Sequence, residues 1–168
     1  MTPPYRVGDE LPPLEIPVTR TLIVAGAIAS RDYQDVHHDA ASAREKGSPD
    51  IFMNILTTNG LVGRYITDHF GPTAVLRKVA IRLGAPNYPG DVLRLTGRIT
   101  ELRTADASSA DASSADASSA DASSDEVVDA VEAIEAVVQV TGGNGIGRHV
   151  TGTVAVTLPE PSVGRAGA

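Results

Sequence analysis

The sequence predicts an α+β protein in which a curved antiparallel β-sheet wraps around one long helix. Two observations support this fold class. Apolar residues recur at helical three- and four-residue spacings through residues 51–70. Beyond residue 72 the chain consists of segments rich in Val, Ile, Leu and Thr that are separated by turn sequences. A sheet of this kind has one face to bury, and a single long helix can cover it.

The helix is predicted over Ile51 to Phe70. Its periodic apolar residues are Ile51, Ile55, Leu56, Val62, Tyr65, Ile66 and Phe70. The Ser-Pro-Asp sequence at 48–50 supplies a capping hydroxyl, a proline near the first turn and an acid at the positive end of the helix dipole. Gly-Pro at 71–72 ends the helix. Gly60 and Gly63 each cost about 1 kcal/mol in a helix, which predicts a close approach to another surface there.

Shorter elements are predicted before this helix. Residues 14–19 form a strand candidate. Residues 21–29 are small and apolar, and their position after a threonine favours a helix with Thr21 as its N-cap. Residues 41–46 fit a single helical turn that ends at Gly47.

Four strands are predicted after the helix. Their ranges are 74–85, 91–101, 126–141 and 148–158, with turn chemistry at 86–91 and 141–147. The segment 126–141 is ambiguous because Glu and Ala favour helix, and its place among strands decides for strand. One early strand, one long helix and four long strands are typical of a single hotdog domain covering residues 1–168.

Residues 105–124 read ADASS four times over. A period of five matches neither a helix face nor a strand face, and alanine is the only apolar residue. The block is therefore predicted to be a disordered surface loop, with a helix as the less favoured alternative because Ser and Asp disfavour helix interiors. Residues 160–168 are predicted to form a loose tail.

Composition excludes several classes of function. The chain has 168 residues and no cysteine, which rules out disulfides, thiolate metal sites and cysteine nucleophiles. The net charge is −7, of which the ADASS block contributes four aspartates, and this argues against nonspecific nucleic-acid binding. The N-terminus does not look like a secretory signal, and no apolar stretch is long enough to span a membrane. A cytoplasmic protein that binds neither nucleic acid nor membrane is expected.

The sequence SRDYQDVHHD at 30–39 concentrates acids and histidines. Asp32 and His37 are five apart in a non-helical stretch, so a carboxylate and an imidazole can meet in a loop. Such a pair can hold a water and share its proton, as adding water to a double bond conjugated to a carbonyl requires. The enolate intermediate needs hydrogen-bond donors, and free amides at the start of the long helix, from Met53 to Asn54 and Ile55, can supply them.

Plainer interpretations of the same residues remain open. Asp and Gln are common turn formers, so the stretch is also explained as a polar turn. A metal site built from His37, His38 and Asp39 is disfavoured because adjacent residues rarely converge on one ion. His69 near the helix end is predicted to interact with the helix dipole, and His149 is predicted to lie at the surface or at a sheet edge. No metal and no cofactor are expected.

Four segments, in order, resemble the MaoC-type hydratases, a family of hotdog enzymes. They are SRDYQDVHHD at 30–39, IFMNILTTNG at 51–60, APNYPGDVL at 85–93 and VTGTVAVTLP at 150–159. The family's S-G-D-x-N-P-x-H-x-D loop places its catalytic acid and histidine on Asp32 and His37. The resemblance implies that Gln34 and Asp39 are structural residues near the site, and it covers most of the chain outside the ADASS block and the tails.

Departures from the family pattern point to a subgroup. Arg31 replaces a glycine, Gln34-Asp35 replaces Asn-Pro, and Met53-Asn54 replaces His-Gly at the helix start. The combination of RDYQDVHHD with the segment 46–68 resembles small subunits of actinobacterial steroid-side-chain enoyl-CoA hydratases. That resemblance implies hydration of a steroid enoyl-CoA in cholesterol side-chain degradation, together with a larger MaoC-like subunit in a heterotetramer, although a homodimer is also conceivable.

Two other functions are weighed against hydration. Hotdog acyl-CoA thioesterases usually place an acid on or near the central helix, where Asp50 and Asn54 are the candidates and neither lies in a convincing motif. A non-catalytic chain that only stabilises a partner is the other alternative. Retention of both Asp32 and His37 argues against it.

Overall fold

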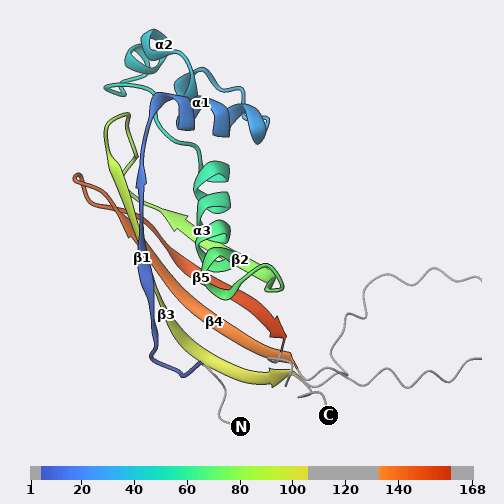
Figure 1. Ribbon diagram of the computed structural model, residues 1–168. Coiled ribbons are helices and arrows are strands. Elements are labelled where there is room, and N and C mark those ends of the chain that lie inside the picture. Colours follow the sequence, from blue (N-terminus) through green and yellow to red (C-terminus); the bar gives the residue numbers. More distant parts are fainter. Residues whose placement is uncertain (1–4, 106–132, 160–168) are drawn as a thin grey trace, which may run out of the picture.

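A computed structural model describes residues 5–105 and 133–159, and within these ranges five strands form one antiparallel sheet in the order β1-β3-β4-β5-β2. The strands are β1 (Glu10–Pro17), β2 (Val75–Leu83), β3 (Val92–Ala105), β4 (Ala133–Gly143) and β5 (Arg148–Pro159). The helices are α1 (Arg20–Ala29), the 3-10 turn η1 (Asp35–His37), α2 (Ala40–Glu45) and α3 (Ile55–Phe70). Figure 1 shows the sheet curving around α3, with α1 and α2 at one end. The predicted hotdog architecture is confirmed.

Strand β4 shows how the core is built. Its buried and less buried residues alternate, and Ile134, Ala136, Val138 and Val140 face the core. Val137 lies on the opposite face and is only partly buried. The strand prediction is confirmed for residues 133–141, whereas 126–132 lie outside the described residues.

Strand β1 begins earlier than predicted, at Glu10 rather than Leu14. Pro12 and Pro13 lie within it, at a shift in its pairing with β3 between Leu11 and Leu14. Proline cannot donate to a neighbouring strand, so it is confined to edge strands and bulges. Both conditions are met here, because β1 lies at the edge of the sheet and its pairing with β3 shifts at the two prolines.

Helix α3 begins at Ile55, not at Ile51. The preceding residues are held by tertiary hydrogen bonds, because the Phe52 amide donates to the Val36 carbonyl and the Met53 amide to the Asn87 carbonyl. The Ile51 and Met53 side chains are buried in the core. The true N-cap is Asn54, whose side-chain oxygen accepts from the Thr57 amide. Ser-Pro-Asp at 48–50 is therefore not the helix start.

The two shorter helices confirm their predictions with shifted ends. Helix α1 is capped by Thr19 rather than Thr21, since the Thr19 hydroxyl accepts from the Leu22 amide. Helix α2 is capped by Asp39, and Gly47 follows it with φ 88°. Asp50 pairs with Arg20 at the start of α1 instead of with the dipole of α3.

The glycines of α3 test the predicted close approach. A Cβ on Gly63 would lie 3.2 Å from Leu76 Cδ1, whereas a Cβ on Gly60 would meet nothing within 4 Å. The close-approach explanation is therefore wrong for Gly60. Gly26 of α1 does approach α3 closely, because a Cβ on it would lie 2.8 Å from Thr57 Cγ2.

Gly60→Ala is expected to stabilise the protein by about 0.5–1 kcal/mol, because alanine is the better helix former and has room. Gly26→Ala is expected to destabilise it, because the added methyl must displace Thr57. Urea unfolding of both variants measures the difference. A loss of stability in Gly60→Ala would show that its surroundings are more crowded than described.

Two predicted segments lie outside the described residues. The ADASS block falls there from residue 106 on, while Ala105 ends β3, and the tail 160–168 falls there entirely. Within the described residues, no helix has the length and apolar character needed to cross a membrane.

Candidate active site

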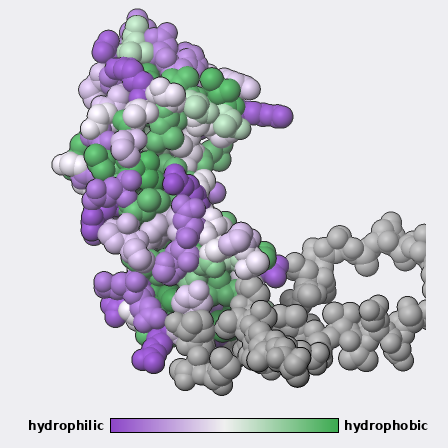
Figure 2. All heavy atoms as spheres, in the orientation of Figure 1, coloured by the Kyte–Doolittle hydropathy of each residue, from purple (hydrophilic) through white to green (hydrophobic). Residues whose placement is uncertain are grey.

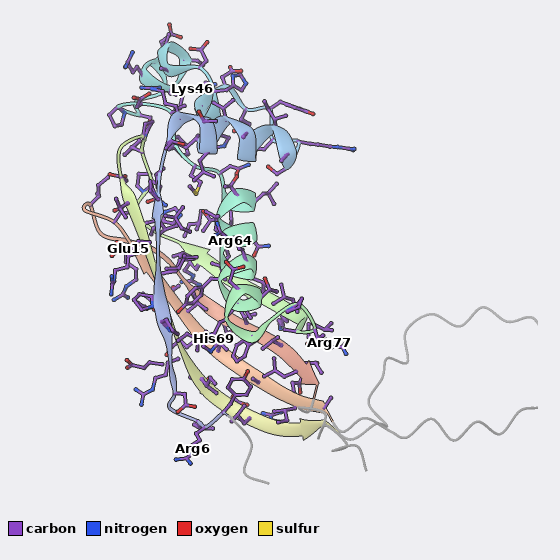
Figure 3. All side chains as sticks on the ribbon, in the orientation of Figure 1. Arg6, Glu15, Lys46, Arg64, His69 and Arg77 are labelled. Atoms are coloured by element: carbon purple, nitrogen blue, oxygen red, sulfur yellow. The ribbon has the colours of Figure 1, made fainter. Side chains whose placement is uncertain are left out.

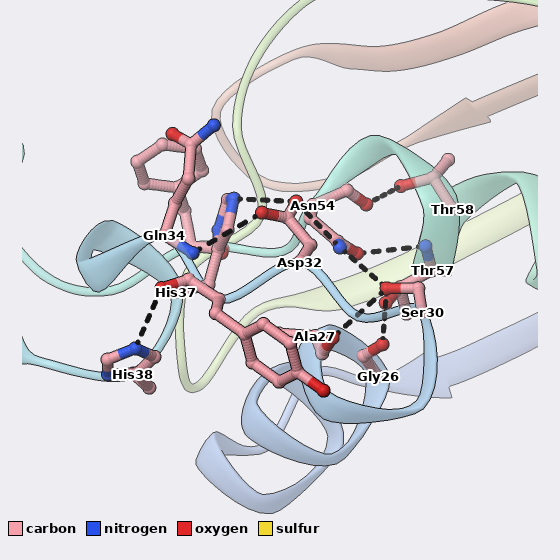
Figure 4. A network of polar contacts seen from close by, with 12 residues as sticks. Gly26, Ala27, Ser30, Asp32, Gln34, His37, His38, Asn54, Thr57 and Thr58 are labelled. Atoms are coloured by element: carbon pink, nitrogen blue, oxygen red, sulfur yellow. Dashed lines mark hydrogen bonds and ion pairs between the residues drawn. The ribbon is translucent and has the colours of Figure 1, made fainter.

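Asp32 and His37 lie together in the loop between α1 and α2. Asp32 follows the end of α1, and its amide donates to the Ala27 carbonyl. His37 lies in η1 and is 6% exposed. Its Nε2 atom is 3.3 Å from Asp32 Oδ2 (Figure 4). The structure therefore brings together the two residues that the spacing and the resemblance had singled out.

The other ring nitrogen of His37 determines the tautomer. Nδ1 lies 2.7 Å from the Phe52 carbonyl oxygen, which can only accept a hydrogen bond. Nδ1 must therefore carry a proton, and in the neutral ring Nε2 presents a lone pair toward the Asp32 carboxylate. At 3.3 Å the two acceptor atoms are too close for a water to lie between them, but one water beside the pair can donate a hydrogen bond to each.

Asp32 is held in its ionised form. The Asn54 side-chain amide donates to Oδ2 at 2.9 Å, and the Gln34 backbone amide lies 3.4 Å from Oδ1. The hydrogen bond from Asn54 holds the pKa of Asp32 below its usual value, against a smaller opposing effect of burial. The Gln34 amide lowers this pKa further, as does the charge of His37 when the ring is protonated. At neutral pH the carboxylate is a permanent acceptor.

Asn54 and Ile55 lie at the start of α3, next to this pair. In the part of the chain that the structure describes, neither backbone amide has a hydrogen-bond acceptor. Met53, which was grouped with them, differs because its amide already donates to Asn87. The side chain of Asn54 was not predicted to take part in hydration, yet its Nδ2 donates to Asp32 Oδ2 and to Ser30 Oγ.

Asp39 and Gln34, the two residues to which the resemblance gives a structural role, differ in their contacts. The Asp39 carboxylate accepts hydrogen bonds from the Ala41 and Ser42 amides at the start of α2, and these bonds lower its pKa. Gln34 faces solvent with its side chain and approaches Asp32 with its backbone. Neither side chain contacts the Asp32–His37 pair through a hydrogen bond in the described residues.

The remaining histidines do not extend the site. His38 is exposed and approaches the Tyr33 carbonyl, and the described residues contain no cluster of three potential metal ligands. His69 lies in the last turn of α3 (Figure 3), where burial lowers its pKa and so disfavours the charged form.

The surface prediction for His149 is wrong. Its ring is 1% exposed and lies between the Ala85 carbonyl and the Thr58 hydroxyl, at 2.6 Å and 2.9 Å. Burial lowers the pKa of His149, so the neutral ring links β5 to the first turns of α3. A lone histidine at a strand start carries no sequence signal for this, because both partners come from distant segments.

Arg31 adopts a backbone conformation that favours glycine. Its φ of 57° is the only positive value at a non-glycine among the described residues. The MaoC-type pattern has glycine at this position, and glycine adopts such a φ without steric cost. A left-handed non-glycine residue costs about 1–2 kcal/mol.

Arg31→Gly is therefore expected to raise the free energy of unfolding by about 0.5–1 kcal/mol, because the relief of strain exceeds the added freedom of the unfolded chain. Arg31→Ala keeps the strain and removes the charge, so it serves as the matched control and should bring no gain. Urea unfolding at neutral pH measures both. Equal stabilisation by the two variants would attribute the effect to the guanidinium instead.

Comparisons with known proteins agree with this fold. A curated relative, the 3-oxo-4,17-pregnadiene-20-carboxyl-CoA hydratase beta subunit of Mycobacterium tuberculosis, is 38% identical over 154 residues, which are 92% of this chain and 97% of that protein. No profile of a known protein family matches the sequence.

Solved structures show the same likeness. A chain of the ChsH1–ChsH2 complex from Mycobacterium tuberculosis matches with a TM-score of 0.70 and 38% identity, over 94% of this chain and 99% of that one. An (R)-hydratase from A. caviae involved in PHA biosynthesis has a TM-score of 0.69 at 18% identity, over 93% and 98% of the two chains, and this likeness concerns the fold alone. With its full-length relative and its hotdog architecture, the chain belongs to the MaoC-like hydratase family.

Proposed function

We propose that this chain is the catalytic subunit of an enoyl-CoA hydratase that acts on a bulky, steroid-type acyl group. The single observation that carries the proposal is the contact between Asp32 Oδ2 and His37 Nε2, with the histidine tautomer set by the Phe52 carbonyl. The acyl group is taken from the name of the curated relative, which acts on a pregnadiene-carboxyl-CoA.

In the proposed reaction, Asp32 and His37 hold one water through their facing acceptor atoms. The water oxygen forms a bond to the β-carbon of the substrate while the pair takes up one of its protons. The π electrons of the double bond move to give an enolate, and the pair then returns the proton to the α-carbon. Atoms and charge balance without any cofactor, as the overall step adds one water.

The enolate oxygen needs hydrogen-bond donors. We assign this role to the backbone amides of Asn54 and Ile55, which lie at the positive end of the α3 dipole and beside Asp32. A backbone amide is independent of the side chain, so the replacement of the family's glycine by Asn54 leaves this donor in place.

We also propose that the chain works with a partner subunit. The relative is called a beta subunit, and the matched structure is a complex of two proteins. Large hydrophobic side chains are exposed around α1, the start of α3 and β2, and Figure 2 shows part of this surface over α1. They are Ile28, Ile55, Leu56, Val75 and Leu76. An exposed apolar area of this kind marks an interaction surface, and a larger MaoC-like chain is the occupant we propose.

The test measures loss of the conjugated double bond and release of free CoA from a steroid enoyl-CoA. Both are measured with this chain alone and after its co-expression with a larger MaoC-like chain from the same organism. Loss of the conjugated double bond without release of free thiol is the expected result. Release of free CoA with the double bond intact would support a thioesterase instead. Activity that needs the partner but persists in variants of Asp32 and His37 would leave this chain a scaffold.

A further inference from the structure

The side chain of Asn54 uses all of its hydrogen-bonding groups within the site. Its Oδ1 accepts from the Thr57 amide at 2.9 Å, while Nδ2 donates to Ser30 Oγ and to Asp32 Oδ2, each at 2.9 Å (Figure 4). Turning the amide over would place two donors against each other at Thr57 and two acceptors against each other at Asp32. The orientation of this side chain, which is 3% exposed, is therefore determined by its partners.

We propose that the Asn54 side chain is a positioning residue that ties the Asp32 carboxylate to the N-terminus of α3. The proposal rests on the hydration function proposed above and adds a role that the backbone amide of Asn54 does not have. Asn54 contacts the same carboxylate oxygen that faces His37 Nε2. It also caps the helix whose free amides we assign to the substrate carbonyl.

This arrangement links the two halves of the site through one residue. The water-holding pair comes from the loop after α1, whereas the carbonyl-binding amides come from α3. Hydration requires the water and the carbonyl to be held at a constant separation, because the β-carbon and the thioester oxygen belong to one rigid conjugated system. A glycine, which the family resemblance places at this position, could not make either side-chain bond.

The same contact sets the charge of Asp32. An N–H that donates to a carboxylate favours its ionised form. The groups that face Asp32 are few: His37 from η1, the Gln34 backbone amide, and the Asn54 amide from α3, while α1 contributes only backbone through Ala27. His37 is thus the only titratable side chain in contact with Asp32 among the described residues. Removing the Asn54 donor should raise the pKa of Asp32.

The experiment compares Asn54→Asp and Asn54→Gly in the co-expressed complex by pH profiles of kcat/KM, which report ionisation in the free enzyme. Both residues are accepted at helix N-caps, so both variants should fold. Because activity needs the carboxylate ionised, a raised pKa moves the acid limb to higher pH. We expect a shift of about one pH unit for glycine and a larger one for aspartate, whose oxygen would face Asp32.

The expected loss of kcat is about 10-fold for Asn54→Gly and about 100-fold for Asn54→Asp, with KM changed less than about threefold, since positioning acts on the chemical step. Thr19→Asp is the matched control. It also places an acid at a helix N-cap, but at α1 and at an exposed site, and its acid limb should coincide with that of the parent complex.

Two outcomes would overturn the inference. Lower stability with an unmoved acid limb in both Asn54 variants would leave Asn54 a helix cap only. A shift in Thr19→Asp equal to that in Asn54→Asp would attribute the effect to general charge. Asp32→Asn separates this from the proposed function: if that variant is inactive and the acid limbs of the Asn54 variants stay in place, the positioning role alone is wrong. If Asp32→Asn is fully active, the proposed function fails first.

Discussion

Replacing Asp32 by Asn or His37 by Ala is expected to lower kcat of the reconstituted hydratase by about 10³-fold, within the 10²–10⁴-fold range of positioned proton transfer. Asn keeps the size of Asp32 but loses the carboxylate that faces His37 Nε2. Ala removes both the lone pair of Nε2 and the anchor at the Phe52 carbonyl. Loss of double-bond absorbance under saturating substrate measures the effect.

The double variant tests whether the two residues act as one unit. Groups that share one water and one proton lose most of their effect when either is removed, so the double variant should be little worse than the worse single variant. His38→Ala is the matched control, because His38 is an exposed neighbour outside the pair. Multiplied losses in the double variant would indicate separate roles for Asp32 and His37.

The largest expected change in stability comes from Gly152→Ala in β5, which should lower the free energy of unfolding by about 3 kcal/mol. A Cβ there would collide with the Ala80 carbonyl and lie 2.9 Å from Ile81 Cα. These atoms are backbone of β2, which pairs in the sheet with β5 alone. Backbone cannot move aside as a flexible side chain does, so the edge strand must shift.

Urea unfolding measures this loss, with Gly145→Ala as the matched control. Gly145 lies in the turn between β4 and β5, and a Cβ there would meet nothing within 4 Å. The control should change stability by less than about 0.5 kcal/mol. Equal stability of the two variants would mean that β2 and β5 accommodate the methyl group by a small separation.

Periodicity predicted the fold class because it reports directly on which faces of an element are buried. It was less able to predict element ends. Ile51 and Met53 are as apolar as the helix they precede, yet the carbonyls of Val36 and Asn87 accept hydrogen bonds from the amides of Phe52 and Met53 and delay the helix to Ile55. Ile55 and Leu56, which fitted the apolar pattern, are 48% and 49% exposed, and the proposed partner gives them a role.

The candidate site could also be predicted only where its residues lie close together in the chain. The five-residue spacing of Asp32 and His37 was visible in the chain because both lie in one loop. The bond from Asn54 to Asp32 spans 22 positions, and the bond between Thr58 and His149 spans 91. Neither type of partner follows a short-range pattern, so the positioning amide and the buried histidine could not be predicted.

The sequence by itself determined the alternation of one long helix with long strands and the local pair of an acid and a histidine, because periodicity and loop spacing are short-range properties. The tertiary structure alone decided where α3 begins, which amides at its start remain free, and how Asn54 holds Asp32. Each of these depends on hydrogen bonds or packing between segments that meet only after the sheet has closed around the helix.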